Sequence, residues 1–336
     1  MDLDTFFTTL YVWIDDWYKA EGAALLARHQ GPSLVMSDSE ILTIGIAGQW
    51  RVGVPWHSER GIMRYLEAHG RGWFPHLLKH SALNERVRDL WAAFVCLQQR
   101  FAEVLETPQS VYESVDCVPV ISCSIAQAAS QRQHRLIEST LGRGGNNGGW
   151  FFGFQLLTSV TSSGAITGWL LGSAHDDDRW LMQVFVSARA GHAEWSGPPY
   201  PRAKGKRLRL PSGRMRPLIA VGKDHHRPYV ADEGFNGERW RLHWLDHYAA
   251  NVITVPPTNA PQRWTPAQKG WLSSHRQIID TVFSRLNDVF GLQRLNAHSD
   301  WGQYTRLAAA MAAYNIGLVM NVLLGRPLGA LATLIC

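Results

Sequence analysis

Three acidic residues occur at positions in the sequence where a carboxylate could take part in chemistry. Asp116 interrupts a run of β-branched and aromatic residues from Tyr112 to Ile121, which is typical of a buried strand. Asp232 follows a second short apolar run and precedes a glycine, and Asp280 lies within a long helical pattern. A buried carboxylate is costly unless it is paired, hydrogen-bonded or bound to a metal. We therefore interpret the three acids as candidates for one site.

The segments around these acids predict alternating strands and helices. Residues 150–161 and 165–171 read as two strands joined by a turn at Ser162-Ser-Gly164, and residues 179–189 as a helix. Further strands are predicted at 218–221 or 228–231 and at 251–255, and helices at 237–250, 269–289 and 303–324. The carboxyl ends of strands in an α/β sheet are where sites are usually built, which favours Asp232 in particular.

From residue 110 to residue 290 the predicted order is strand, strand, strand, helix, strand, helix, strand, helix. This is the order of a ribonuclease-H-like fold, so the predicted fold class is α/β, a mixed sheet flanked by helices. The first 106 residues read as wholly helical. Three carboxylates suit metal-assisted phosphoryl transfer, because Mg²⁺ prefers oxygen ligands and two ions can assist the attacking and leaving oxygens.

Five short motifs in this order resemble bacterial insertion-sequence transposases of the DDE type. They contain the acids in Ser114-Val-Asp116-Cys-Val-Pro119, Ala231-Asp232-Glu-Gly-Phe-Asn236 and Arg276-Gln-Ile-Ile-Asp280. The others are Phe151-Phe-Gly-Phe-Gln155 with the following His175-Asp176, and a helical leader with Met36-Ser-Asp-Ser-Glu-Ile-Leu-Thr43 and Trp73-Phe-Pro75. The resemblance extends from about residue 36 to residue 325.

The resemblance implies a DNA transposase that cleaves at transposon ends and joins the freed 3′-hydroxyl to target DNA. It implies Asp116, Asp232 and Asp280 as ligands of two Mg²⁺ ions, with Mn²⁺ able to substitute, and Arg276 as a phosphate contact one helical turn before Asp280. The implied partner is double-stranded DNA, both terminal inverted repeats and target, and cutting two ends suggests a homodimer. The expected location is the bacterial cytoplasm, at the nucleoid.

The chain departs from the family at three positions. Asp280 replaces the usual Glu, and Ser273 and Asn287 replace a Tyr and a Lys. These departures leave open a decayed or domesticated transposase that binds DNA without chemistry. A generic nuclease that cleaves without joining ends is a third alternative.

A basic segment from Ser196 to Arg216 is the strongest candidate for contact with the DNA backbone. Alternatively, this segment is a surface loop that contacts no partner. The residues that we assign to DNA binding, beside Arg276, are Arg202, Lys204, Lys206, Arg207, Arg209 and Arg214.

Composition is compatible with this reading. The 336 residues carry 33 Lys and Arg against 28 Asp and Glu, a net charge of +5, which tolerates a polyanionic partner. We expect a helical DNA-binding region at 1–106, a catalytic domain at 107–300 with a basic insertion at about 190–227, and a C-terminal helix at 301–336. The four cysteines form no C-x-x-C pair, so neither zinc nor a disulfide framework is indicated. The apolar stretch 307–324 carries two asparagines and reads as a buried helix, so no membrane partner is expected.

Two other strings resemble metal-hydrolase signatures, Lys223-Asp-His-His226 and His175-Asp-Asp-Asp178. Neither brings the partner motifs that its family needs. We interpret Asp176, Asp177 and Asp178 as caps of the following helix.

Overall fold

The computed structural model describes residues 1–25, 34–107, 109–123, 139–144, 149–191, 218–222, 224–256, 263–295, 297 and 299–335. The chain divides into two compact units. One contains Met1–Val104, Arg285–Ala297 and Trp301–Cys336, and the other contains Leu105–Ser284 and His298–Asp300. The basic residues predicted to bind DNA, Arg202, Lys204, Lys206, Arg207, Arg209 and Arg214, lie outside the described residues.

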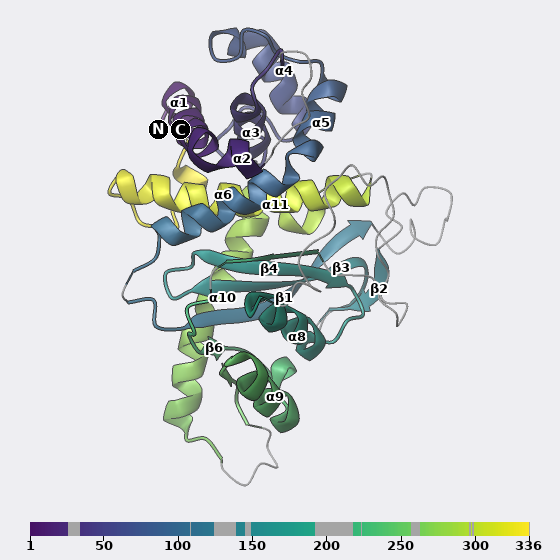
Figure 1. The fold of residues 1–336 in the computed structure, drawn as a ribbon, viewed down its shortest axis with the longest axis vertical. Coiled ribbons are helices and arrows are strands. Elements are labelled where there is room, and N and C mark those ends of the chain that lie inside the picture. The colour runs from purple at the N-terminus through teal and green to yellow at the C-terminus, as the bar shows by residue number, and fades with distance from the viewer. Residues whose placement is uncertain are drawn as a thin grey trace. The chain divides into compact units, whose positions relative to one another are not determined.

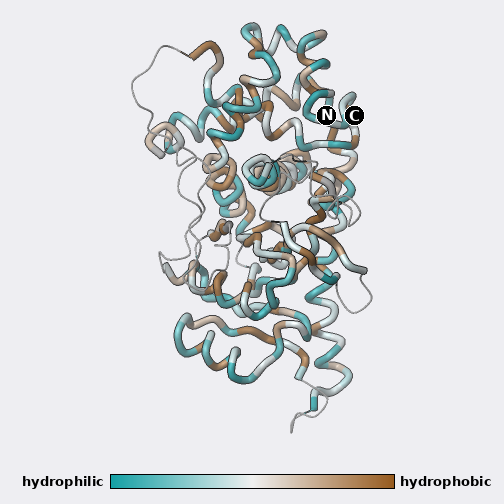
Figure 2. The backbone as a smooth tube through the Cα atoms, turned by 90° about the vertical axis from the view of Figure 1, so that its right-hand side faces the viewer, coloured by the Kyte–Doolittle hydropathy of each residue, from teal (hydrophilic) through white to brown (hydrophobic). Residues whose placement is uncertain are grey.

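The first unit is helical. Its N-terminal helices are α1 (Leu3–Trp17), α2 (Ala23–Leu25), α3 (Asp38–Ala47), α4 (Glu59–His69), α5 (His80–Asp89) and α6 (Trp91–Val104). A capping box begins α3, because Ser37 Oγ accepts from the Glu40 N–H while the Glu40 carboxylate accepts from the Ser37 N–H. Hydrophilic and hydrophobic residues alternate along many helices in Figure 2, as expected for helices that bury one face.

Helix α11 (Asp300–Leu323) belongs to this helical unit, together with the last turn of α10 (Pro266–Phe290). Among the described residues α11 is the one helix long and apolar enough to span a membrane, and 83% of its apolar window is buried. Its buried Asn315 donates to the backbone oxygen of Gln98 at 2.9 Å. This is the environment of a core helix in a soluble protein, and the apolar character of α11 follows from that burial.

The second unit is an α/β sheet. The strands are β1 (Glu113–Cys123), β2 (Thr140–Arg143), β3 (Trp150–Thr161), β4 (Ile166–Ser173), β5 (Leu218–Val221), β6 (Tyr229–Val230) and β7 (Val252–Ile253). Their order is β5-β4-β3-β1-β6-β7, with β2 paired to β3. Strands β1, β3, β4 and β5 pair antiparallel, whereas β6 pairs parallel with both β1 and β7. The prediction of a mixed sheet flanked by helices, with an N-terminal helical region, is confirmed.

Helices cover both faces of this sheet (Figure 1). On one face α8 (Asp178–Arg189) and α9 (Glu238–Tyr248) pack over Val115, Leu157 and Leu170. On the other face lies the first part of α10, where Ser114 Oγ donates to the backbone oxygen of His275. Because side chains alternate along a strand, Val115 faces α8 and α9 while Ser114 and Asp116 face α10.

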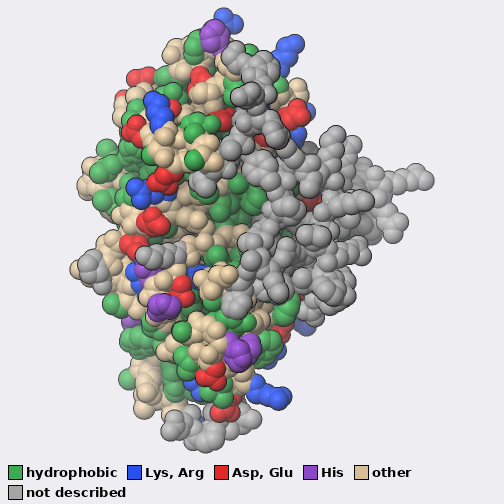
Figure 3. Space-filling view, in the orientation of Figure 1, with side chains coloured by type: hydrophobic (Ala, Val, Ile, Leu, Met, Phe, Trp, Pro, Cys, Tyr) green, Lys and Arg blue, Asp and Glu red, His purple; other side chains and the backbone are tan. Residues whose placement is uncertain are grey.

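The face drawn in Figure 3 presents basic and acidic side chains interspersed among the described residues. No continuous basic patch is formed there by the residues that the figure colours.

Candidate functional site

Asp116 lies on β1 of the sheet unit, and Asp232 follows directly after its parallel neighbour β6. Tyr229 and Val230 pair with Glu113 and Ser114, and the same register continued by two residues sets Asp232 beside Asp116. The guanidinium of Arg276 lies between them, with Nη2 3.0 Å from Asp116 Oδ2 and 4.0 Å from Asp232 Oδ2. The structure thus brings together two of the three acids that the sequence selected, and the arginine beside them.

Asp232 is held by the turn that follows β6. Its Oδ1 accepts from the Gly234 N–H at 2.8 Å, which begins the short 3-10 helix Glu233–Phe235. Strand β6 is only two residues long, so the chain leaves the sheet and turns directly after Asp232. A polar side chain at the carboxyl end of a central parallel strand is well placed to meet a ligand.

Asp178 is a third carboxylate in the same place, and the sequence analysis did not select it. A Cβ atom added at Gly234 would lie 2.6 Å from Asp178 Oδ2 and 2.9 Å from Asp232 Oδ1. The two carboxylates therefore border the same small space, and a Cβ atom at position 234 would displace at least one of them. Asp178 comes from the first turn of α8, on the opposite face of the sheet from Arg276.

The interpretation of three consecutive aspartates as helix caps is correct for one of them. Asp177 caps α8 and accepts from the Arg179 N–H at 3.0 Å. Asp176 instead accepts from the Ser173 N–H at 2.8 Å and closes the turn after β4. Asp178 borders the same space as Asp232 from the first turn of α8, five residues after β4 ends at Ser173, and the signal that could have identified it is its place in the acidic string His175-Asp-Asp-Asp178.

Burial and neighbouring negative charge raise the pKa values of Asp116 and Asp178. Burial and the neighbouring charge of Asp232 raise the pKa of Asp116 to about 7, against the opposing effects of Arg276 and of the Cys117 N–H. Burial also raises the pKa of Asp178, although a hydrogen bond from the Cys117 thiol opposes that shift. Carboxylates whose pKa is raised by burial and mutual repulsion form a site that favours a cation.

Arg276 supplies the positive charge that balances the pair in this structure. Its side chain is 26% exposed and comes from the face of α10 that packs on the sheet. Because the guanidinium is shared unequally, at 3.0 Å and 4.0 Å, it holds Asp116 more closely than Asp232. A cation that binds between the two acids would therefore compete with Arg276 for Asp116.

Asp280, the predicted third acid, lies one helical turn beyond Arg276 and is exposed. No hydrogen bond or ion pair joins it to Asp116, Asp178 or Asp232. Its role as a metal ligand stays a prediction.

The donor chemistry of the site fits a hard divalent cation, since all three clustered ligands are carboxylate oxygens. Yet no three His, Cys, Asp or Glu side chains of the described residues converge closely enough to hold a metal ion as they stand. The Arg276 guanidinium lies near two of these acids, 3.0 Å from Asp116 Oδ2 and 4.0 Å from Asp232 Oδ2. A metal ion could enter only if Arg276 moved away from Asp116.

A polar cavity of about 520 Å³ opens on the Asp178 side of the site. Its lining includes Gln155, Arg143 and the exposed Trp150, together with Ala174–Asp178. The cavity is large enough for a substrate group to approach Asp178 from solvent.

Comparison of the chain with protein-family models, with curated proteins and with solved structures finds no match.

Proposed function

We propose that the protein is a DNA transposase of the DDE type, with metal-dependent phosphoryl transfer at the Asp116–Asp232 pair. The observation that carries the proposal is the meeting of these two acids on adjacent parallel strands around Arg276. The sheet order supports it, because β4-β3-β1-β6-β7 is the strand order of a ribonuclease-H-like core. In such a core, the acid on the first strand (here β1) and the acid after the strand that pairs parallel with it (here β6) lie side by side.

The metal ligands in this proposal are Asp116 and Asp232, with Asp178 or Asp280 as the third acid. When bound, Mg²⁺ or Mn²⁺ ions would activate the attacking oxygen and stabilise the leaving one. Asp178 is favoured by its position against Asp232, and Asp280 by the order of the sequence motifs.

Arg276 has two roles in this proposal. In the structure described here it neutralises Asp116, and it keeps two repelling carboxylates close together. Once cations replace its charge there, the guanidinium is released at the edge of the site. The planar guanidinium, with its paired N–H donors, is suited to bind a DNA phosphate.

The partners in this proposal are the two ends of the transposon and a target duplex, bound by a homodimer at the bacterial nucleoid. The net charge of +5 and the basic segment that contains Arg207 and Arg209 support a polyanionic partner. The helical first unit supplies a second surface for end recognition.

A DNA-binding protein without catalytic activity is the second candidate. It is favoured by the ion pair that fills the place of a cation and by the exposed position of Asp280. This candidate predicts DNA binding that is independent of divalent metal, with no strand cleavage.

A plasmid that carries the DNA flanking the protein's own reading frame provides the test. Incubation with Mg²⁺ or Mn²⁺ should yield 3′-end cleavage and joining to a target plasmid, and Asp116→Ala should abolish both while it spares binding to the ends. Undiminished transfer by Asp116→Ala would overturn the assignment. Cleavage without joining would favour the generic nuclease.

Asp178→Asn and Asp280→Asn identify the third ligand. Mn²⁺ affinity, measured by titration calorimetry on the full chain, should fall about tenfold or more for the variant that removes a ligand. The other variant serves as its control, because each substitution removes one negative charge.

A further inference from the structure

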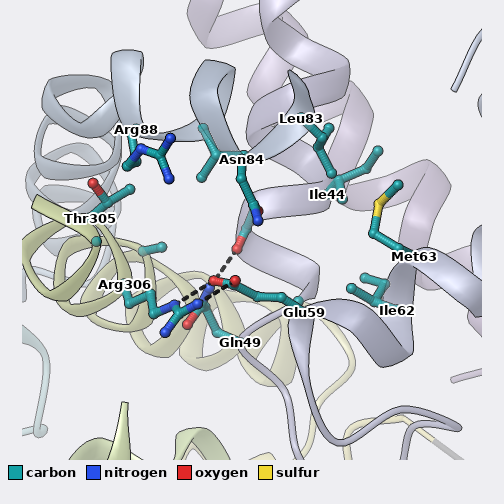
Figure 4. Close-up of a pocket in the computed structure, with 15 residues that line it drawn as sticks. Ile44, Gln49, Glu59, Ile62, Met63, Leu83, Asn84, Arg88, Thr305 and Arg306 are labelled. Atoms are coloured by element: carbon teal, nitrogen blue, oxygen red, sulfur yellow. Dashed lines mark hydrogen bonds and ion pairs between the residues drawn. The ribbon is translucent and has the colours of Figure 1, made fainter. Parts of the chain in front are cut away.

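The helical unit contains a cavity of its own, separate from the acidic site. It has a volume of about 60 Å³ and lies among α3, α4, α5 and α11 (Figure 4). By comparison with the space that one water molecule needs, this is room for about four to six heavy atoms. The cavity therefore suits a very small ligand.

One wall of the cavity contains a buried acceptor with no partner. Gln49 is only 4% exposed, and its Nε2 donates to the backbone oxygen of Gly45 at 2.8 Å. Its Oε1 accepts no hydrogen bond from any described residue. A buried carbonyl oxygen without a donor is unfavourable, so a ligand with an N–H or O–H group is favoured here.

A second wall contributes an uncompensated positive charge. Arg88 and Asn84 point from α5 into the cavity (Figure 4), and the Arg88 guanidinium makes no hydrogen bond or ion pair with any other described residue. The other ionised groups of the lining, Glu59 and Arg306, neutralise each other in a two-pronged ion pair. The lining as a whole is therefore cationic, which favours an anion.

The opposite side of the cavity is apolar. Figure 4 shows Ile44, Ile62, Met63 and Leu83 facing the polar groups across the space. Ile62, Met63 and Leu83 are each at most 3% exposed. A ligand of this cavity must carry a short hydrocarbon part as well as its polar groups.

We propose that this cavity binds a small aliphatic 2-hydroxycarboxylate. The carboxylate pairs with the Arg88 guanidinium, which is suited to a two-pronged contact with two oxygens. The hydroxyl donates to Gln49 Oε1, and the short alkyl group lies against Ile62 and Leu83. The size limit of about six heavy atoms admits 2-hydroxypropanoate and excludes longer chains from full burial.

The test is titration of the full chain with 2-hydroxypropanoate and with propanoate, which lacks only the hydroxyl, followed by calorimetry or ligand-observed NMR. The wild-type protein should bind 2-hydroxypropanoate about tenfold or more tightly than propanoate, because propanoate leaves Gln49 Oε1 without a donor. Gln49→Met should remove that difference, since it keeps the bulk of the side chain and deletes the acceptor.

Arg88→Met should weaken both acids about tenfold or more, whereas Arg64→Met should change neither. Arg64 is exposed on α4 and does not line the cavity, so it controls for a general loss of positive charge. Absence of binding to the wild-type protein, equal binding of the two acids, or an equal effect of Arg64→Met would overturn the proposal. If neither acid binds, water alone fills the cavity. The comparison of the two acids on the wild-type protein decides the matter even if a variant fails to fold.

Discussion

Replacement of Asp116 by asparagine should stabilise the metal-free protein above neutral pH. In the folded chain the pKa of Asp116 is raised from 3.8 to about 7, through burial and the negative charge of Asp232. The folded state therefore holds a proton on this carboxyl at pH values where the unfolded state has lost it. Folding stability from this group is present below pH 4 and is lost as the pH rises through 7.

The magnitude follows from the size of the shift. A pKa raised from 3.8 to about 7 corresponds to about 4 kcal/mol of native-state destabilisation once the group is ionised. Asp116 is 17% exposed, so solvent screens this cost only in part. The shift already includes the opposing effect of Arg276, so the loss of that ion pair in the asparagine variant is not subtracted again. We therefore expect a net gain in unfolding free energy of about 1–3 kcal/mol at pH 8, and almost none at pH 4.

The assay is urea unfolding with a chelator at pH 4, 6 and 8, compared between the wild type and Asp116→Asn. Groups that do not interact with Asp116 titrate equally in both proteins, so their contributions cancel in the difference. Asp280→Asn is the matched control, because this acid is exposed and its replacement should change stability by less than about 0.5 kcal/mol. A gain that does not grow with pH, or a variant less stable than the wild type at pH 8, would refute the electrostatic reasoning. With saturating Mn²⁺ the order should reverse, since the proposed ligand is missing from the variant.

Three further changes probe the candidate site and the unit that holds it. Gly234→Ala should lower Mn²⁺ affinity about tenfold or more without any loss of charge, because the added Cβ would lie 2.6 Å and 2.9 Å from oxygens of two carboxylates. Unaltered affinity in a calorimetric titration would show that these two acids do not bind the metal. Arg189→Met should reduce the unfolding free energy, measured in urea, by about 3–5 kcal/mol, because Glu113 would stay buried without its cation at 2.6 Å. The additional replacement Glu113→Gln should restore part of that loss. Equal stability of the single and double variants would contradict this reasoning. Neutralising Arg207 and Arg209 should weaken DNA binding and reduce its salt slope by about 1–2, and an unchanged slope across a salt series would leave the basic segment without contact to DNA.

Much of the secondary structure of the sheet unit could be predicted because its signals are local. The strand predicted from Tyr112 to Ile121 is found at Glu113–Cys123, and the hairpin at residues 162–164 joins β3 to β4 as expected. These elements follow from β-branched content and from a glycine at positive φ in the turn, Gly164. Strand β2 was missed, because Thr140–Arg143 has little apolar content and is specified by its pairing with β3.

The division of the chain into units was less accessible from the sequence. The apolar pattern predicts the long helices α10 and α11 to within a few residues. It does not say that residues 285–297 and 301–336 cluster with the N-terminal helices, since an apolar helix can bury its surface against any partner.

The sequence by itself determined which residues could do chemistry and on which elements they lie. Asp116 in a buried strand, Asp232 after a short strand and Arg276 on a helix were all evident from local pattern. Only the tertiary structure decided which side chains meet, because strand register and helix packing bring together residues as far apart as Asp116 and Arg276, 160 positions along the chain. For the same reason Asp178, which local pattern assigned to a helix cap, borders the same space as Asp232 beside Gly234.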